Sequence, residues 1–162
     1  MYKLFVLLMT LSSYSISAEW HAKIVHDSMN DSKKGWVQYW AGDKQSVQIS
    51  CDELGWDKEL SLFIVFKKYI DSDGLSRLDL RFDKEKMFTV RAKTYKKELY
   101  IKDNKKIIDL MKQKKQLRLR TYDYEGRRHM FSVSLMGFTK ALNDACGWWL
   151  NDTGEGEGAS NS

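Results

Sequence analysis

The stretch that decides the fold is FSVSLMGFTKALNDACGWW, residues 131–149. It begins as a strand, because apolar residues alternate with serines as far as Leu135. Beyond that point the apolar residues recur at three- and four-residue spacing, which is typical of an amphipathic helix. We therefore expect a strand and then a short helix over residues 135–146, with Ser134 as its N-cap and Gly147 at its C-terminal end.

Residues 1–18 have the pattern of a secretory signal peptide. A positive charge near the start is followed by the mostly apolar residues 4–11 and then by small and polar residues. The apolar run is shorter than the about 20 residues that a membrane-spanning helix needs. Cleavage after Ser17 and cleavage after Ala18 both remain open. We expect an exported protein, periplasmic or secreted, with no transmembrane segment after signal removal.

Cys146 lies on the last turn of the expected helix, and the other cysteine, Cys51, ends the strand-like run SVQISC. Two cysteines in an exported chain most often pair, whereas in the cytosol they are more often reduced. We therefore expect a Cys51–Cys146 disulfide that joins the end of the chain to an early strand. The alternative is two unrelated buried thiols.

The chain between leader and tail has the length of one domain, which we place at residues 19–150. The whole sequence is 43% hydrophobic and 13% aromatic, which argues against a disordered protein. Residues 151–162 are instead rich in Gly, Ser and acidic residues, so we expect a disordered tail there.

Short alternating segments with tight connections run through most of the domain. They predict a mainly β fold, an antiparallel β-sandwich or curled sheet of about seven to nine short strands. The apolar run LSLFIVF, residues 60–66, predicts a central strand. Residues 42–44 predict a hairpin turn, and residues 71–74 predict a second turn. A second short helix is expected over about residues 103–115, with Asp103 as its N-cap.

Several short motifs carry a resemblance to a known family. They are F-x-V-x-L followed by G-F-x-x-A-L-x-x-x-C-x-W in residues 131–148, V-Q-I-S-C (47–51), L-R-F-D (80–83) and L-R-L-R-T (117–121). With Trp20 they span most of residues 20–149. This pattern resembles the VasI/TagO group of exported proteins associated with type VI secretion and, more distantly, the invasion-associated locus B group. The resemblance implies a β-rich fold, export and an association with the cell envelope.

Residues 84–128 carry much of the positive charge, with sixteen Lys and Arg against six Asp and Glu. A segment of this charge attracts an acidic envelope protein or an anionic envelope component such as lipid headgroups. The alternative is a solvated helix face that serves solubility. Nucleic acid is not expected as a partner, because the chain has an export leader and no recognisable nucleic-acid-binding module. The expected anion-binding patch consists of Lys105, Lys106, Lys112, Lys114, Lys115, Arg118, Arg120, Arg127 and Arg128.

Trp148 and Trp149 follow the expected helix. We expect one of them to pack under the sheet and the other to form an exposed contact point for a partner.

Candidate catalytic and metal-binding groups are few. The three histidines, His21, His26 and His129, lack the spacing of paired metal ligands. No serine stands in a Gly-x-Ser-x-Gly motif, and a disulfide would leave no thiol nucleophile. Residues 71–74 resemble the start of a calcium loop, but the later ligands are missing. We expect no catalytic residue, no bound metal and no cofactor.

These observations favour a non-enzymatic, exported accessory or binding protein of the bacterial cell envelope, with the resemblance implying an association with type VI secretion. The alternative is a periplasmic inhibitor or immunity protein that acts against an envelope-acting enzyme or toxin. The identity of the partner and the oligomeric state stay open at this point.

Overall fold

A computed structural model provides the structure of the protein, and it describes residues 19–53, 60–102 and 104–152. Within these residues the strands form one antiparallel sheet of nine, in the spatial order β1-β2-β3-β4-β7-β6-β5-β8-β9. The strands are β1 (Trp20–Asp27), β2 (Ser32–Trp40), β3 (Ser46–Asp52), β4 (Ser61–Val65), β5 (Asp71–Phe82), β6 (Phe88–Lys96), β7 (Glu98–Ile101), β8 (Gln116–Tyr122) and β9 (Arg128–Ser134). The helices are α1 (Lys105–Gln113) and α2 (Phe138–Asp152).

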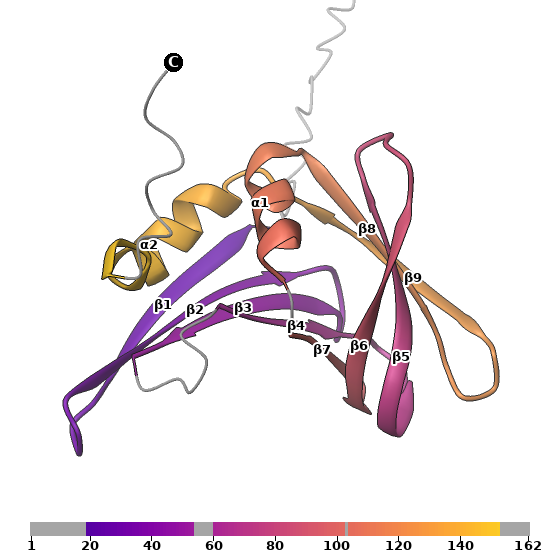
Figure 1. The fold of residues 1–162 in the computed structure, drawn as a ribbon, viewed down its shortest axis with the longest axis horizontal. Helices are drawn as coiled ribbons and strands as arrows, with labels where there is room; N and C mark the ends of the chain where they lie inside the picture. Colours follow the sequence, from indigo (N-terminus) through magenta and orange to yellow (C-terminus); the bar gives the residue numbers. More distant parts are fainter. Residues whose placement is uncertain (1–18, 54–59, 103, 153–162) are drawn as a thin grey trace, which may run out of the picture.

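The sheet is strongly curled, and both helices lie on its concave side (Figure 1). The expected mainly β fold, in its curled-sheet form and with two helices, is therefore confirmed. Alternation along most strands sends one row of apolar side chains to the concave face, where the core lies. The other row points to the convex face, where most side chains are at least partly exposed.

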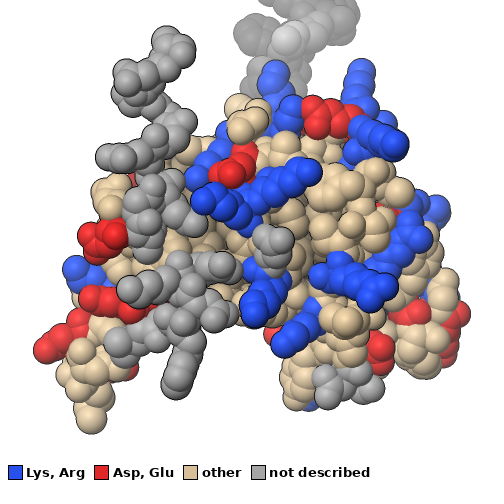
Figure 2. All heavy atoms as spheres, viewed as in Figure 1, with Lys and Arg blue, Asp and Glu red and all other residues tan. Residues whose placement is uncertain are grey.

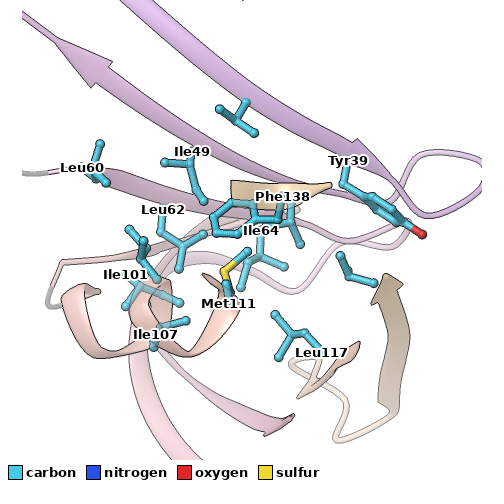
Figure 3. Close-up of a cluster of buried hydrophobic side chains, with 14 of the residues drawn as sticks. Tyr39, Ile49, Leu60, Leu62, Ile64, Ile101, Ile107, Met111, Leu117 and Phe138 are labelled. Atoms are coloured by element: carbon cyan, nitrogen blue, oxygen red, sulfur yellow. The ribbon is translucent and has the colours of Figure 1, made fainter. Parts of the chain in front are cut away.

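The core is filled from the sheet on one side and from the helices on the other. Figure 3 shows Ile107 and Met111 of α1 among Leu62, Ile64 and Ile101 of the sheet. All five side chains are at most 2% exposed. The apolar run predicted as a central strand becomes β4, which lies inside the sheet between β3 and β7.

The helix at the end of the chain differs from the prediction at both of its ends. It begins at Phe138, because Gly137 adopts a φ of 81° and the segment before it forms a turn. Ser134 therefore accepts the N–H of Met136 at 3.4 Å in that turn and does not cap the helix. The helix also continues through Gly147, which was expected to end it. The reason is that the buried stripe extends further along it. The buried residues of α2 are Phe138, Ala141, Leu142, Ala145, Cys146, Trp149 and Leu150.

Other boundaries also differ from the predictions. The helix expected over residues 103–115 is the shorter α1, and Asn104 occupies its N-cap position. Its predicted N-cap, Asp103, lies outside the described residues, as do the predicted signal peptide and residues 153–162. The turn expected at residues 71–74 is instead the beginning of β5, with an irregular register against β6. Residues 151 and 152, placed in the tail, belong to α2.

The disulfide is formed as predicted. Cys51 of β3 and Cys146 of α2 are bonded, and both are fully buried. Cys51 is directly opposite Gly35 of β2, and a Cβ atom on Gly35 would lie 2.2 Å from the carbonyl oxygen of Ala145. The absence of a side chain at Gly35 therefore lets α2 approach the backbone of β2 closely enough for the bond.

Trp20 connects the two edges of the curled sheet. Its indole Nε1 donates a hydrogen bond to the carbonyl of Ser134 at 2.8 Å, which joins the start of β1 to the end of β9. Its ring also packs against Tyr39 and Phe138, at centroid distances of 5.2 and 4.8 Å. These contacts and the disulfide join β1, β9, α2 and β3 at one end of the sheet. They involve no side chain on the convex face of β5, β6, β8 or β9.

Candidate functional site

The convex face of β5, β6, β8 and β9 carries an unusual number of arginines. In β5, Leu78, Leu80 and Phe82 are buried in the core, so the side chains between them point outward. The same alternation turns the arginines of β6, β8 and β9 to this face. We call this surface the outer arginine face. Its members are Arg77, Arg81, Arg91, Arg118, Arg120 and Arg128.

Strand register places several of these arginines directly opposite one another. Arg77 of β5 is paired with Arg91 of β6, and Arg81 of β5 is paired with Arg118 of β8. Directly opposite side chains on one face have Cβ atoms about 4.5–5.5 Å apart, and like charges at that distance are destabilising. The outer arginine face thus contains two unfavourable like-charge pairs in adjacent ladders.

Asp79 lies between these two pairs along β5, and it binds Arg77 of the first pair and Arg120 of β8. Its side chain is 1% exposed although it points to the convex face. It accepts hydrogen bonds from Thr89 Oγ1 at 2.7 Å, Arg77 Nε at 2.8 Å and Arg120 Nε at 2.9 Å. Burial raises the pKa of Asp79, but these three hydrogen bonds outweigh burial and hold the pKa below its ordinary value. The carboxylate therefore stays charged and fixes Arg77 and Arg120 in place.

The remaining arginines are not neutralised in this way. Arg91 and Arg118 are exposed, and neither forms an ion pair or a hydrogen bond with its side chain within the part of the chain that the structure describes. Arg81 donates hydrogen bonds to the backbone carbonyls of Lys84 and Glu85. These acceptors are neutral, so no acidic side chain among the described residues balances the charge of Arg81. The face consequently holds positive charge that its own residues do not balance.

Two hollows mark this face. One is a pocket of about 450 Å³ between the β5–β6 turn and β8, and its lining includes Arg81, Met87, Arg118 and Met130. The other, of about 680 Å³, is lined by residues that include Arg77 and Arg91. Each hollow therefore lies beside one of the two like-charge arginine pairs.

The nine residues of the predicted patch fall into three groups. The lysines belong to α1 and the segment that follows it, on the helix side of the sheet. Arg118 and Arg120 lie on β8 in the outer arginine face. Arg127 and Arg128 follow the β8–β9 turn, where Arg127 is bound to Asp123 and Arg128, the first residue of β9, also belongs to the outer arginine face. Figure 2 shows basic residues spread over α1 and over the side of the molecule that holds β5 and β6. Lys112 pairs with Asp109 and Lys114 with Glu85, which partly neutralises the helix group.

Sequence reasoning missed Arg77, Arg81 and Arg91 as members of a cationic surface. The alternation of residues 75–82 already indicates that Arg77 and Arg81 point away from the core. What the sequence does not indicate is that β5 lies between β6 and β8, because the β5–β8 pairing joins strands far apart in the chain. This pairing brings the arginines of three strands together.

The two terminal tryptophans differ in burial. Trp149 is 4% exposed and belongs to the core. Trp148 is half-buried, and its indole Nε1 donates to the carbonyl of Ala145 at 2.9 Å. The Nζ of Lys33 lies 6.0 Å from the Trp148 ring centroid. The use of Trp148 as a contact point for a partner stays a prediction.

A second buried carboxylate, Asp123, stabilises the turn between β8 and β9. Its side chain is 1% exposed and lies 2.9 Å from Nε2 of His129. It also accepts the backbone N–H groups of Glu125 at 3.0 Å and Arg127 at 2.8 Å. The hydrogen bond from His129 is the largest influence and lowers the pKa of Asp123. Burial opposes this shift, but the Arg127 and Glu125 donors add to it, so the pKa lies well below its ordinary value.

We expect Asp123 to make folding stability depend on acid pH. A carboxyl whose pKa is lower in the folded state stabilises the fold above its unfolded pKa, and this contribution is lost as the pH falls below about 5. Asp123→Asn should therefore be less stable than the wild type at neutral pH and should lose less stability on acidification. Urea midpoints measured from neutral to acid pH test this, with Asp144→Asn, at an exposed position of α2, as the control. An unchanged slope for Asp123→Asn would contradict the expectation.

The described residues contain no group of three or more His, Cys, Asp or Glu side chains placed to hold a metal ion. Within the same residues, neither helix is long and apolar enough to cross a membrane. Comparisons of the chain with protein-family models, with curated proteins and with solved structures gave no match.

Proposed function

We propose that this chain is a non-enzymatic binding protein of the bacterial cell envelope, and that its outer arginine face binds an anionic partner. The proposal rests on the two pairs of directly opposite arginines that lie on either side of the buried carboxylate of Asp79 along β5. Asp79 offsets only part of the repulsion between these arginines, because it pairs with Arg77 and Arg120 and leaves Arg81, Arg91 and Arg118 without an acidic partner among the described residues. An anion bound across these arginines would relieve the repulsion between them. Anion binding therefore explains the arrangement better than a contribution to the stability of the fold does.

The chemistry of the guanidinium group supports an anionic partner. Arginine binds carboxylate and phosphate groups with two parallel hydrogen bonds, and its charge persists at every physiological pH. Because Asp79 holds Arg77 and Arg120 in place, part of the face is already ordered before a partner arrives. Less conformational entropy is then lost on binding.

The location and the biological system are part of the same proposal. The leader-like residues 1–18 support export to the periplasm or beyond, and the Cys51–Cys146 disulfide is compatible with it. An association with type VI secretion is supported by the resemblance of the sequence motifs alone.

Charge reversal at two of the unpaired arginines, Arg91 and Arg118, tests the proposal. We expect Arg91→Glu combined with Arg118→Glu to weaken binding of the purified protein to washed envelopes of the parent bacterium by about tenfold or more at low salt. High salt should reduce wild-type binding in the same way, because exposed charges are screened within about 10 Å at 0.1 M salt. Arg120 is left intact, because a glutamate there would face the buried carboxylate of Asp79.

A matched variant separates the outer arginine face from the helix lysines. Lys106→Glu combined with Lys112→Glu changes the net charge by the same amount but on α1. We expect this variant to retain most of the wild-type binding. If instead the α1 variant loses binding and the arginine variant does not, the lysine group is the binding surface. If both bind as the wild type does, the basic residues are a solvated surface.

A further inference from the structure

The pocket on the outer arginine face has a framework that holds its walls in position. Asp83, in the β5–β6 turn, accepts the backbone N–H of Gln116 at 2.9 Å and that of Lys115 at 3.1 Å. Its own N–H donates to the carbonyl of Gln116 at 2.9 Å. Arg81 ties the same turn to the sheet through the carbonyls of Lys84 and Glu85. The turn is therefore anchored to β8 by hydrogen bonds within the protein itself.

The charge on the pocket lining favours an anion. Lys84, Lys86, Arg81 and Arg118 all contribute to the lining. The two acidic residues of the lining are already paired, Asp79 with Arg77 and Arg120, and Glu85 with Lys114. An anionic group entering the pocket would meet guanidinium and ammonium groups that no acidic residue of the lining balances.

The pocket also has an apolar part, which is unexpected on a charged face. Met87 and Met130 are 38% and 54% exposed, and both contribute to the lining. They flank Arg120, since an Arg120 guanidinium nitrogen lies 3.0 Å from Met87 Sδ and Met130 is the strand partner of Arg120. Methionine side chains adapt to irregular apolar shapes, so two of them beside a cationic group can accommodate a flexible hydrocarbon.

We propose that this pocket binds an anionic group, carboxylate or phosphate, that carries a short unbranched hydrocarbon chain. The anion lies against Arg118 and Arg81, and the chain lies along the exposed surfaces of Met87 and Met130. The volume of about 450 Å³ is within the range of pockets that hold small molecules. This inference rests on the proposed function, because it specifies the chemistry of an anion that the outer arginine face would bind.

Methyl NMR of the exported protein labelled at the methionine methyl groups tests the inference directly. Octanoate and octyl phosphate should each shift the Met87 and Met130 signals in a saturable way, and the tighter ligand shows which anionic group is preferred. Met29 and Met136, which are 91% and 69% exposed, should not shift. Single Met→Leu variants assign the signals, and the buried Met111 reports that the fold is intact.

Two control ligands and one variant separate the parts of the site. Octyl glucoside carries the same chain without charge, and inorganic phosphate carries the charge without the chain, so each should bind at least about tenfold more weakly than octyl phosphate. Arg118→Gln should weaken octyl phosphate by a similar factor without moving the Met111 signal. Equal binding of octyl glucoside and octyl phosphate would overturn the anionic part of the inference, and equal binding of inorganic phosphate would overturn the apolar part.

The two proposals fail in different ways. If octanoate and octyl phosphate leave Met87 and Met130 unshifted while the Arg91/Arg118 reversal still abolishes envelope binding, the pocket inference is wrong and the proposed function stands. If the reversal leaves envelope binding unchanged, the proposed function is wrong, whatever the methionine signals show. Shifts at Met29 and Met136 as large as those at Met87 and Met130 would indicate general association with hydrocarbon and would overturn the pocket inference.

Discussion

Replacing both Cys51 and Cys146 with alanine is expected to lower the free energy of unfolding by about 4–5 kcal/mol on the chain-entropy model. The disulfide closes a loop between residues that are 95 positions apart, which restricts the unfolded chain strongly. It also fixes α2, which carries seven of the buried core residues, onto β3. Urea unfolding of the oxidised wild type and of the double variant measures the difference.

Reduction provides the control for this prediction. The wild type with dithiothreitol should unfold near the urea midpoint of the double variant, because both lack the cross-link. Circular dichroism in the absence of urea shows whether the sheet persists in each. A double variant as stable as the oxidised wild type would show that contacts of α2 with the sheet suffice without the bond.

Replacing Gly35 with alanine is expected to cost at least about 3 kcal/mol, at the upper end of the range for overpacked sites. The added Cβ would lie 2.2 Å from the carbonyl oxygen of Ala145 and 2.6 Å from Cys51 Sγ. Neither atom can move easily, because one belongs to the backbone of α2 and the other to the buried disulfide. Either α2 must move away from β2 or the strand must bend, and both changes disturb the core.

Gly147 supplies the matched control. It lies in α2, and a Cβ atom there would have no neighbour within 4 Å. Gly147→Ala should therefore raise the free energy of unfolding by about 0.5–1 kcal/mol, because alanine favours helix more than glycine does. Urea midpoints of the two variants should move in opposite directions. A Gly35→Ala midpoint equal to or above that of the wild type would contradict the close approach of α2 to β2.

Local patterns predicted most of the strands because each pattern depends only on neighbouring residues. Alternation in residues 75–82 indicates which side chains of β5 are buried, and the structure confirms that Leu78, Leu80 and Phe82 are. The turn at residues 42–44 was also predicted from neighbouring residues alone. The structure agrees, because Gly42 and Lys44 adopt positive φ there. The extent of α2 could not be predicted from neighbouring residues. Gly147 is a local stop signal, and the burial of Trp149 and Leu150 overrides it.

The sequence by itself determined the mainly β character of the protein and the concentration of positive charge in residues 84–128, and it predicted the cysteine pairing that the structure shows. These depend on composition, on periodicity and on a count of two cysteines. Only the tertiary structure decided which charges share a surface. Arg77, Arg91 and Arg118 come from three strands, and they meet because β5 pairs with both β6 and β8. Non-local pairing is determined by how the whole core packs, and the residues of any single strand do not contain it.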